Sequence, residues 1–135
     1  GLIPFVALTA AILVDHHHGM LWSDALIGYG ALILSFVGAL HWAFAMTLPD
    51  LTEQQRTARF VWSVMPALLA WPALLVDATM ASFLLVPGFV AHYLQDKRLA
   101  RSQTLPDWYL PLRFHLTTVA CLCLSVLGVL SFGQV

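Results

Sequence analysis

Six histidines are present in this sequence, and an imidazole could ligate a metal, bind haem or transfer a proton. Three of them, His41, His92 and His115, lie inside or at the edge of long apolar stretches. An ionisable side chain within a membrane is costly, and it is therefore a candidate functional residue. Converging imidazoles could ligate a metal or haem, or hydrogen-bond a quinone or a lipid headgroup. The simpler interpretation is hydrogen bonding between helices or snorkelling to the membrane surface.

Aromatic and cationic residues near these histidines extend the candidate site. No two of the histidines have a ligand spacing such as i, i+4 on one helix, so their convergence depends on packing. The sequence therefore names no cofactor; quinone, haem and bound lipid stay open as alternatives. The candidate contacts to a ligand or headgroup are His41, Trp42, His92, Trp108, Arg113 and His115.

The stretch DHHHG at residues 15–19 could bind Zn²⁺ or Cu²⁺ in a loop. Adjacent residues cannot easily all ligate one ion, so a solvated loop is the favoured interpretation. We predict no metal site, and His16, His17 and His18 are the weak candidates.

Enzymatic motifs are not apparent. The sequence has no phosphate-binding glycine loop and no HExxH, and its acids fall in connections or at the ends of apolar runs. A proton path through mid-membrane carboxylates is therefore disfavoured, and we do not expect an enzyme. The seven acids are Asp15, Asp24, Asp50, Glu53, Asp77, Asp96 and Asp107.

The composition indicates an integral membrane protein of one domain, residues 1–135. Hydrophobic residues make up 60% of the chain and charged residues 10%, whereas soluble domains average about 25% charged residues. A net charge of −1 gives no reason to expect nucleic acid as a partner. The expected partners are the lipid bilayer, another membrane protein or a second copy of the chain.

Five apolar runs predict an all-α, polytopic transmembrane helical bundle with about five spans. Pro66, Pro72 and Pro87 fall inside these runs, where proline kinks a membrane helix rather than ending it. The first run is short for a full span and is either a truncated span or a half-inserted segment. The runs are residues 1–14, 25–48, 59–76, 78–95 and 111–133.

The cations set the predicted orientation. All six Lys and Arg residues fall in two alternate connections, residues 49–59 and 95–113. The positive-inside rule places both connections on the cytoplasmic side of a bacterial inner membrane, or on the matrix side of a mitochondrial inner membrane.

Two stripes of small residues predict the faces on which helices pack, because small side chains let membrane helices approach closely. One stripe runs along residues 25–48 and the other along residues 111–133. Their members are Gly28, Ala31, Ser35, Gly38 and Ala45, then Thr118, Cys121, Ser125 and Gly128.

Four segments resemble domain-of-unknown-function family 3429, which includes a mitochondrial transmembrane protein and many bacterial inner-membrane proteins. They are GLIPF (1–5), YGALILSFVGALHW (29–42), SVMPALLAW (63–71) and PDWYLPLRFHLT (106–117). The family pattern carries a second glycine where Ala39 stands and an arginine where His41 stands. This departure argues against a catalytic role for His41 and favours a polar residue held between helices near the headgroups. The resemblance implies a small polytopic membrane protein and supplies no activity.

Two functions follow as hypotheses. The first is a non-enzymatic multi-pass inner-membrane protein that acts as an accessory or assembly subunit of a larger membrane complex. The alternative is a membrane protein that binds a quinone, haem or lipid headgroup through the histidines near the inner boundary.

Overall fold

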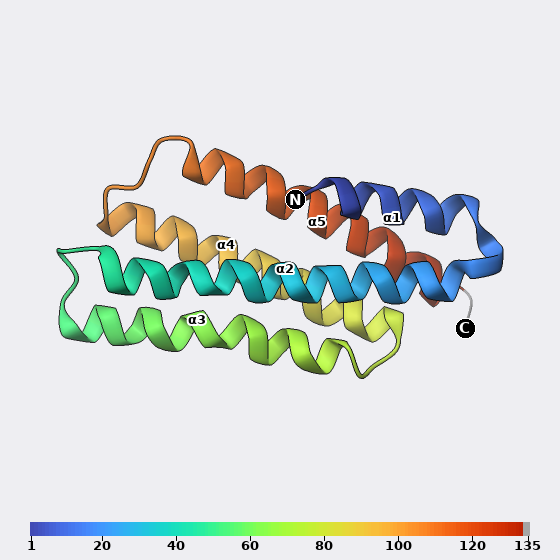
Figure 1. Cartoon of the computed structure of the whole chain (residues 1–135), viewed down its shortest axis with the longest axis horizontal. Helices are drawn as coiled ribbons and strands as arrows, with labels where there is room; N and C mark the ends of the chain where they lie inside the picture. The colour runs from blue at the N-terminus through green and yellow to red at the C-terminus, as the bar shows by residue number, and fades with distance from the viewer. Residues whose placement is uncertain (134–135) are drawn as a thin grey trace.

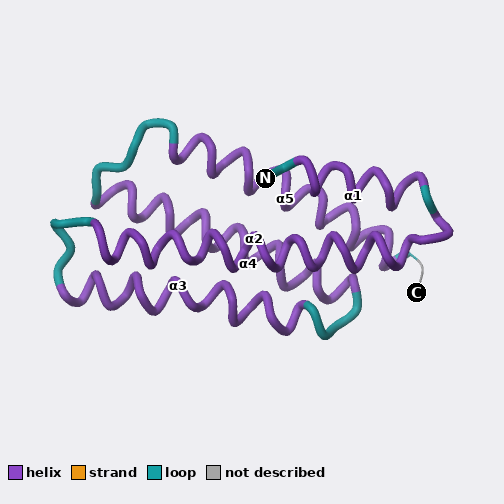
Figure 2. Tube along the Cα trace, viewed as in Figure 1, coloured by secondary structure: helices purple, strands orange, loops and turns teal. Residues whose placement is uncertain are grey.

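The computed structural model describes residues 1–133 and consists of helices packed lengthwise (Figure 1). They are α1 (Ile3–Val14), α2 (Gly19–Thr47), α3 (Glu53–Ala73), α4 (Ala78–Ser102) and α5 (Tyr109–Phe132), with a short 3₁₀ helix at His16–His18. Figure 2 shows helices joined by short loops and no strand among the described residues. The predicted all-α class is confirmed.

Successive helices run antiparallel, and α2 packs along α3 while α4 packs along α5. We call the end with the 48–52 and 103–108 loops the basic end, because the Lys and Arg residues lie toward it. We call the opposite end, with the 74–77 loop, the far end. The short helix α1 contacts α2 and α5, and its Phe5 packs edge-on against Tyr29 and Phe89.

Local sequence signals explain where the helices begin. Thr52 and Gln55 form a reciprocal capping box at the start of α3, and the Asp77 carboxylate accepts a hydrogen bond from the Met80 N–H at the start of α4. Helices α3 and α4 continue through their internal prolines, which is common in membrane helices. Two connections are more helical than the sequence predicted. Helix α2 already begins at Gly19, and α4 continues to Ser102, because helical hydrogen bonding does not stop where an apolar run ends.

The apolar surface of the bundle is consistent with a membrane protein. Helices α2 to α5 expose large apolar side chains, among them Leu32, Leu68, Phe83 and Leu122. Soluble monomers rarely expose so much contiguous apolar area. Two segments, His16–Thr47 and Tyr109–Phe132, are long and apolar enough to cross a bilayer by length and composition.

The stripe on α2 lies largely against its neighbours. Ala31, Gly38 and Ala45 are buried, and a Cβ added at Gly38 would stand 3.0 Å from the Ser63 carbonyl oxygen. A Cβ added at Gly28 would meet nothing within 4 Å, so Gly28 makes no close approach.

The stripe predicted on α5 lies partly against α4 and is partly exposed. Thr118 and Ser125 are exposed, and Cys121 and Gly128 are half-buried. The fully buried face lies next to this stripe on the helix and carries both large and small side chains: Tyr109, Arg113, Thr117, Ala120, Cys123, Leu124 and Leu127. A Cβ added at Gly128 would stand 3.1 Å from the Ser82 Cβ of α4, so this glycine of the stripe lies at a close helix approach, whereas Thr118 and Ser125 do not.

Candidate functional site

Five polar side chains from three helices meet inside the bundle toward the basic end; we call them the buried network. His41 comes from α2, His92 and Asp96 from α4, and Tyr109 and Arg113 from α5. The i, i+4 spacing within α4 and within α5 puts each pair on one helix face. His41, His92 and Asp96 are 0% exposed, and Arg113 is 3% exposed. Burial of this degree requires that each charge be paired and hydrogen-bonded.

Asp96 is the centre of the buried network. Its Oδ1 accepts hydrogen bonds from His41 Nε2 at 2.9 Å and from the Tyr109 hydroxyl at 3.1 Å. Its Oδ2 accepts from Arg113 Nε at 2.8 Å. These three donors come from two other helices, so one carboxylate ties α4 to both α2 and α5.

The partners of the two histidines determine whether the bonded ring nitrogen donates or accepts. The carboxylate only accepts, so His41 must carry a proton on Nε2. Arg113 Nη2 lies 3.1 Å from His92 Nδ1, and a guanidinium only donates. His92 Nδ1 therefore accepts, and a neutral His92 carries its proton on Nε2. With neutral histidines, the Asp96 carboxylate and the Arg113 guanidinium balance each other.

The buried network contains the residue types of a metal site, but the guanidinium of Arg113 occupies the position where an ion would bind. Ligand atoms of His41, His92 and Asp96 lie within 4.8 Å of one another, the single such group of three or more among the described residues. However, Arg113 already bonds Asp96 Oδ2 and His92 Nδ1, two of the atoms that would ligate an ion. A cation at this point would also face the positive guanidinium. The arrangement suits an ionic link between helices better than a metal centre.

The structure brings together three of the six candidate contacts, His41, His92 and Arg113. His115 is exposed, and its Nδ1 lies 2.6 Å from the Pro111 carbonyl oxygen of its own helix. Trp42 and Trp108 are 48% and 65% exposed. Neither hydrogen-bonds to the buried network, although the Trp108 ring stands edge-on to that of Tyr109 with centroids 6.3 Å apart.

Asp96 and Tyr109 belong to the buried network but were not among the candidate contacts predicted from the sequence. Asp96 was grouped with acids at span ends, yet it is completely buried. The i, i+4 spacing between His92 and Asp96 could have indicated that the two side chains share a helix face. The same spacing between Tyr109 and Arg113 could have indicated the second pair.

The DHHHG stretch forms the turn that leads into α2. Asp15 Oδ2 accepts from Trp22 Nε1 at 3.2 Å and lies 2.9 Å from His18 Nδ1. The Trp22 hydrogen bond, followed by the one to His18, holds the pKa of Asp15 below its usual value. Both contacts tie the turn to the helix it precedes, which gives the aspartate a local structural role.

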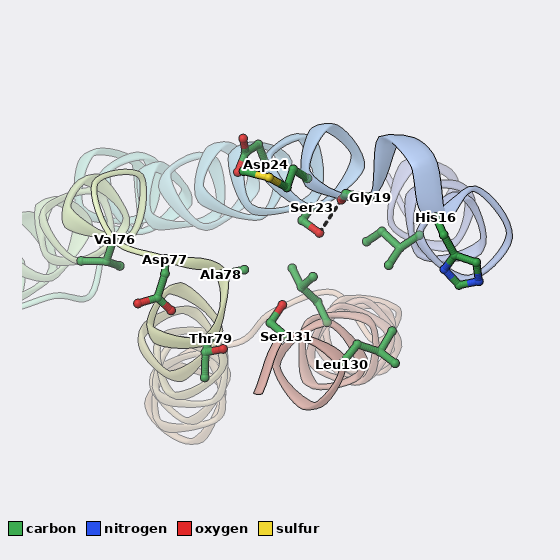
Figure 3. Close-up of a pocket in the computed structure, with 13 residues that line it drawn as sticks. His16, Gly19, Ser23, Asp24, Val76, Asp77, Ala78, Thr79, Leu130 and Ser131 are labelled. Atoms are coloured by element: carbon green, nitrogen blue, oxygen red, sulfur yellow. Dashed lines mark hydrogen bonds between the residues drawn. The ribbon is translucent and has the colours of Figure 1, made fainter. Parts of the chain in front are cut away.

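A cavity of about 470 Å³ opens at the far end, between α2, α4 and α5 (Figure 3). Figure 3 shows Ser23 of α2 facing Ser131 of α5, with Asp77 and Thr79 on a third side. The Ser23 hydroxyl donates to the Gly19 carbonyl at 2.7 Å, so it is already engaged within its helix. Although His16 and Asp24 also line this cavity, it holds no converging metal-ligand group among residues 1–133.

Sequence comparison adds the family to these observations. Residues 1–129 match the family described as "Protein of unknown function (DUF3429)". The chain belongs to this family. It is also 37% identical over 129 residues to Transmembrane protein 69 of Xenopus tropicalis, an alignment that covers 89% of this chain and 47% of that protein.

The resemblance noted from the sequence is thereby confirmed. The chain spans about half the length of this curated relative. No solved structure matches the chain. The relative's name and the two apolar helices together support a membrane protein.

Proposed function

We propose that this chain is a multi-pass inner-membrane protein without enzymatic activity, which acts as an accessory or assembly subunit of a larger membrane complex. The observation that carries the proposal is that the charged groups of the buried network, Asp96 and Arg113, are paired with each other, although His41 Nδ1 and His92 Nε2 have no partner among the described residues. Asp96 has three donors, and Arg113 fills the space between Asp96 and His92. What remains for interaction is a broad apolar helical surface, which suits contact with lipid and with other membrane helices.

Binding of haem or quinone through the histidines finds little support in this arrangement. Haem ligation needs an imidazole nitrogen that opens onto a cavity large enough for the cofactor. His41 Nε2 and His92 Nδ1 are engaged with Asp96 and Arg113. The other two ring nitrogens have no partner among the described residues, but they are buried in side chains that are 0% exposed. An absorbance scan of the purified protein tests haem, and a stoichiometric Soret band would restore that alternative. Organic extraction followed by mass spectrometry tests quinone, and a stoichiometric quinone would restore it.

The proposal includes five membrane crossings with the basic end on the cytoplasmic or matrix side. Its support is that Lys97, Arg98 and Arg101 end α4 while Arg56 and Arg59 begin α3, so these cations share one end of the bundle. Single-cysteine labelling with an impermeant reagent, after replacement of Cys121 and Cys123, tests the orientation. Probes at Thr104 and His17 should label from opposite sides. Labelling from one side would contradict the five-span topology.

Native mass spectrometry after extraction in several mild detergents tests the subunit role. The expected result is a particle that contains a second membrane protein in a fixed ratio. A monomer without a protein partner in every detergent would contradict the role. The Asp96→Asn variant is measured alongside wild type. If the partner binds the surface of the bundle, the fraction of protein that retains the partner should fall only as far as the folded fraction falls.

A further inference from the structure

Helix α3 carries hydrogen-bond donors without acceptors toward the basic end. Arg56, Arg59 and Trp62 follow one another at intervals of three residues, which keeps them within about a third of the helix circumference. Arg56 Nε and Trp62 Nε1 are buried and have no partner among the described residues. Arg56 Nη2 makes one long hydrogen bond, 3.4 Å, to the Leu48 carbonyl oxygen. An unpaired buried donor is unfavourable, so this face requires an acceptor.

The charges around Arg59 also require an anion. Arg59 lies within electrostatic range of Asp96 and of Arg98, and no hydrogen bond reaches its guanidinium within residues 1–133. Asp96 is already balanced by Arg113 at 2.8 Å. Glu53, one turn before Arg56, is exposed and forms no ion pair among the described side chains. Arg59 and Arg98 therefore lack a counter-charge of their own.

The surroundings of this face indicate the chemistry of the missing acceptor. Phe60 packs edge-on against Trp42 with ring centroids 5.0 Å apart, which gives the region an aromatic flank. Further along α3, Val61, Val64 and Met65 are exposed apolar side chains. A ligand that satisfies both parts combines anionic oxygens with hydrocarbon, which describes a phospholipid with a net negative headgroup.

We propose that Arg56, Arg59 and Trp62 of α3, together with Arg98 of α4, bind the headgroup phosphate of an anionic phospholipid. Guanidinium groups pair with phosphate oxygens through several parallel hydrogen bonds, and the indole N–H adds one donor. The acyl chains lie along the exposed apolar residues of α3. The inference goes beyond the accessory role and does not depend on it.

Native mass spectrometry of the full chain in mild detergent, titrated with phosphatidylglycerol or phosphatidylcholine, tests the site. We expect wild type to retain phosphatidylglycerol in preference to phosphatidylcholine. Arg59→Gln should weaken retention by about fivefold, the effect of losing one cation at a headgroup. Arg101→Gln is the matched control, because it removes the same charge from an exposed position at the end of α4. It should retain the lipid within about twofold of wild type.

Three results would overturn the proposal. Equal retention of the two lipids by wild type would show that no anionic site exists. A loss in Arg101→Gln as large as that in Arg59→Gln would show general charge attraction. Unchanged lipid retention in the Arg56→Gln/Arg59→Gln double variant would show that the arginines of α3 do not bind the headgroup. If Arg59→Gln fails to fold by circular dichroism, Arg98→Gln, at an exposed position, replaces it with the same expected loss.

Discussion

The two ends of the bundle are held together by different forces. Toward the basic end, α2, α4 and α5 are joined through one carboxylate that receives three hydrogen bonds. Toward the far end, the same helices meet through apolar side chains such as Leu26, Leu124 and Leu127, each at most 1% exposed. The polar residues of that end line an open cavity instead of a closed contact.

The difference shows how a small membrane bundle can fix its helix arrangement. Lipid is as apolar as leucine, so apolar contacts between membrane helices depend on close fit and have little directional preference. A buried ion pair has strict geometric requirements, and breaking it leaves an uncompensated charge. We therefore expect the basic end to determine which helix faces meet and the far end to tolerate more substitution.

The largest effect should come from Asp96→Asn. The substitution keeps the side-chain shape but leaves the Arg113 guanidinium buried without a counter-charge. The free energy of unfolding should fall by about 3–5 kcal/mol. Reversible unfolding in mixed micelles, followed by circular dichroism, measures this. Asp107→Asn, at an exposed position, is the control and should stay near wild type. Equal stability of Asp96→Asn and wild type would contradict the claim that the ion pair between Asp96 and Arg113 stabilises the bundle.

The sequence predicted much of the fold and only part of the buried network. The apolar runs predicted helices in the right order, because membrane helices need long apolar segments. It also singled out His41, His92 and Arg113. Asp96 was passed over because an acid beside Lys97 and Arg98 looks like part of an aqueous connection. Only the packing of α5 against α4 puts Arg113 2.8 Å from this carboxylate, and no local pattern encodes that distance.

A smaller effect is expected in the apolar contact at Leu124. This residue is 0% exposed, so Leu124→Ala should leave a cavity and lower stability by about 2–3 kcal/mol, the low end for such changes. The neighbouring Leu122 is 62% exposed and faces away from the core, so Leu122→Ala is the matched control. The same unfolding assay should find the control near wild type. If Leu122→Ala proves as costly as Leu124→Ala, the assigned packing face of α5 is incorrect.

The smallest effect should come from His115→Ala. The ring is exposed and interacts with a carbonyl of its own helix, so its loss should change stability by less than about 0.5 kcal/mol. Unfolding of this variant beside His41→Ala sharpens the contrast, because His41 donates to Asp96 from another helix. Similar losses in the two variants would contradict the assignment of His41, and not of His115, to the buried network.

The most direct test of the ionic link is a double-mutant cycle between Asp96 and Arg113, using Asp96→Asn, Arg113→Gln and the double variant. The two residues are 2.8 Å apart and share no aqueous surface, so their effects should be far from additive. We predict a coupling free energy of about 2–3 kcal/mol, with the double variant more stable than the sum of the single losses implies. A coupling below about 0.5 kcal/mol, the level of independent sites, would contradict the claim that this pair holds α4 and α5 together.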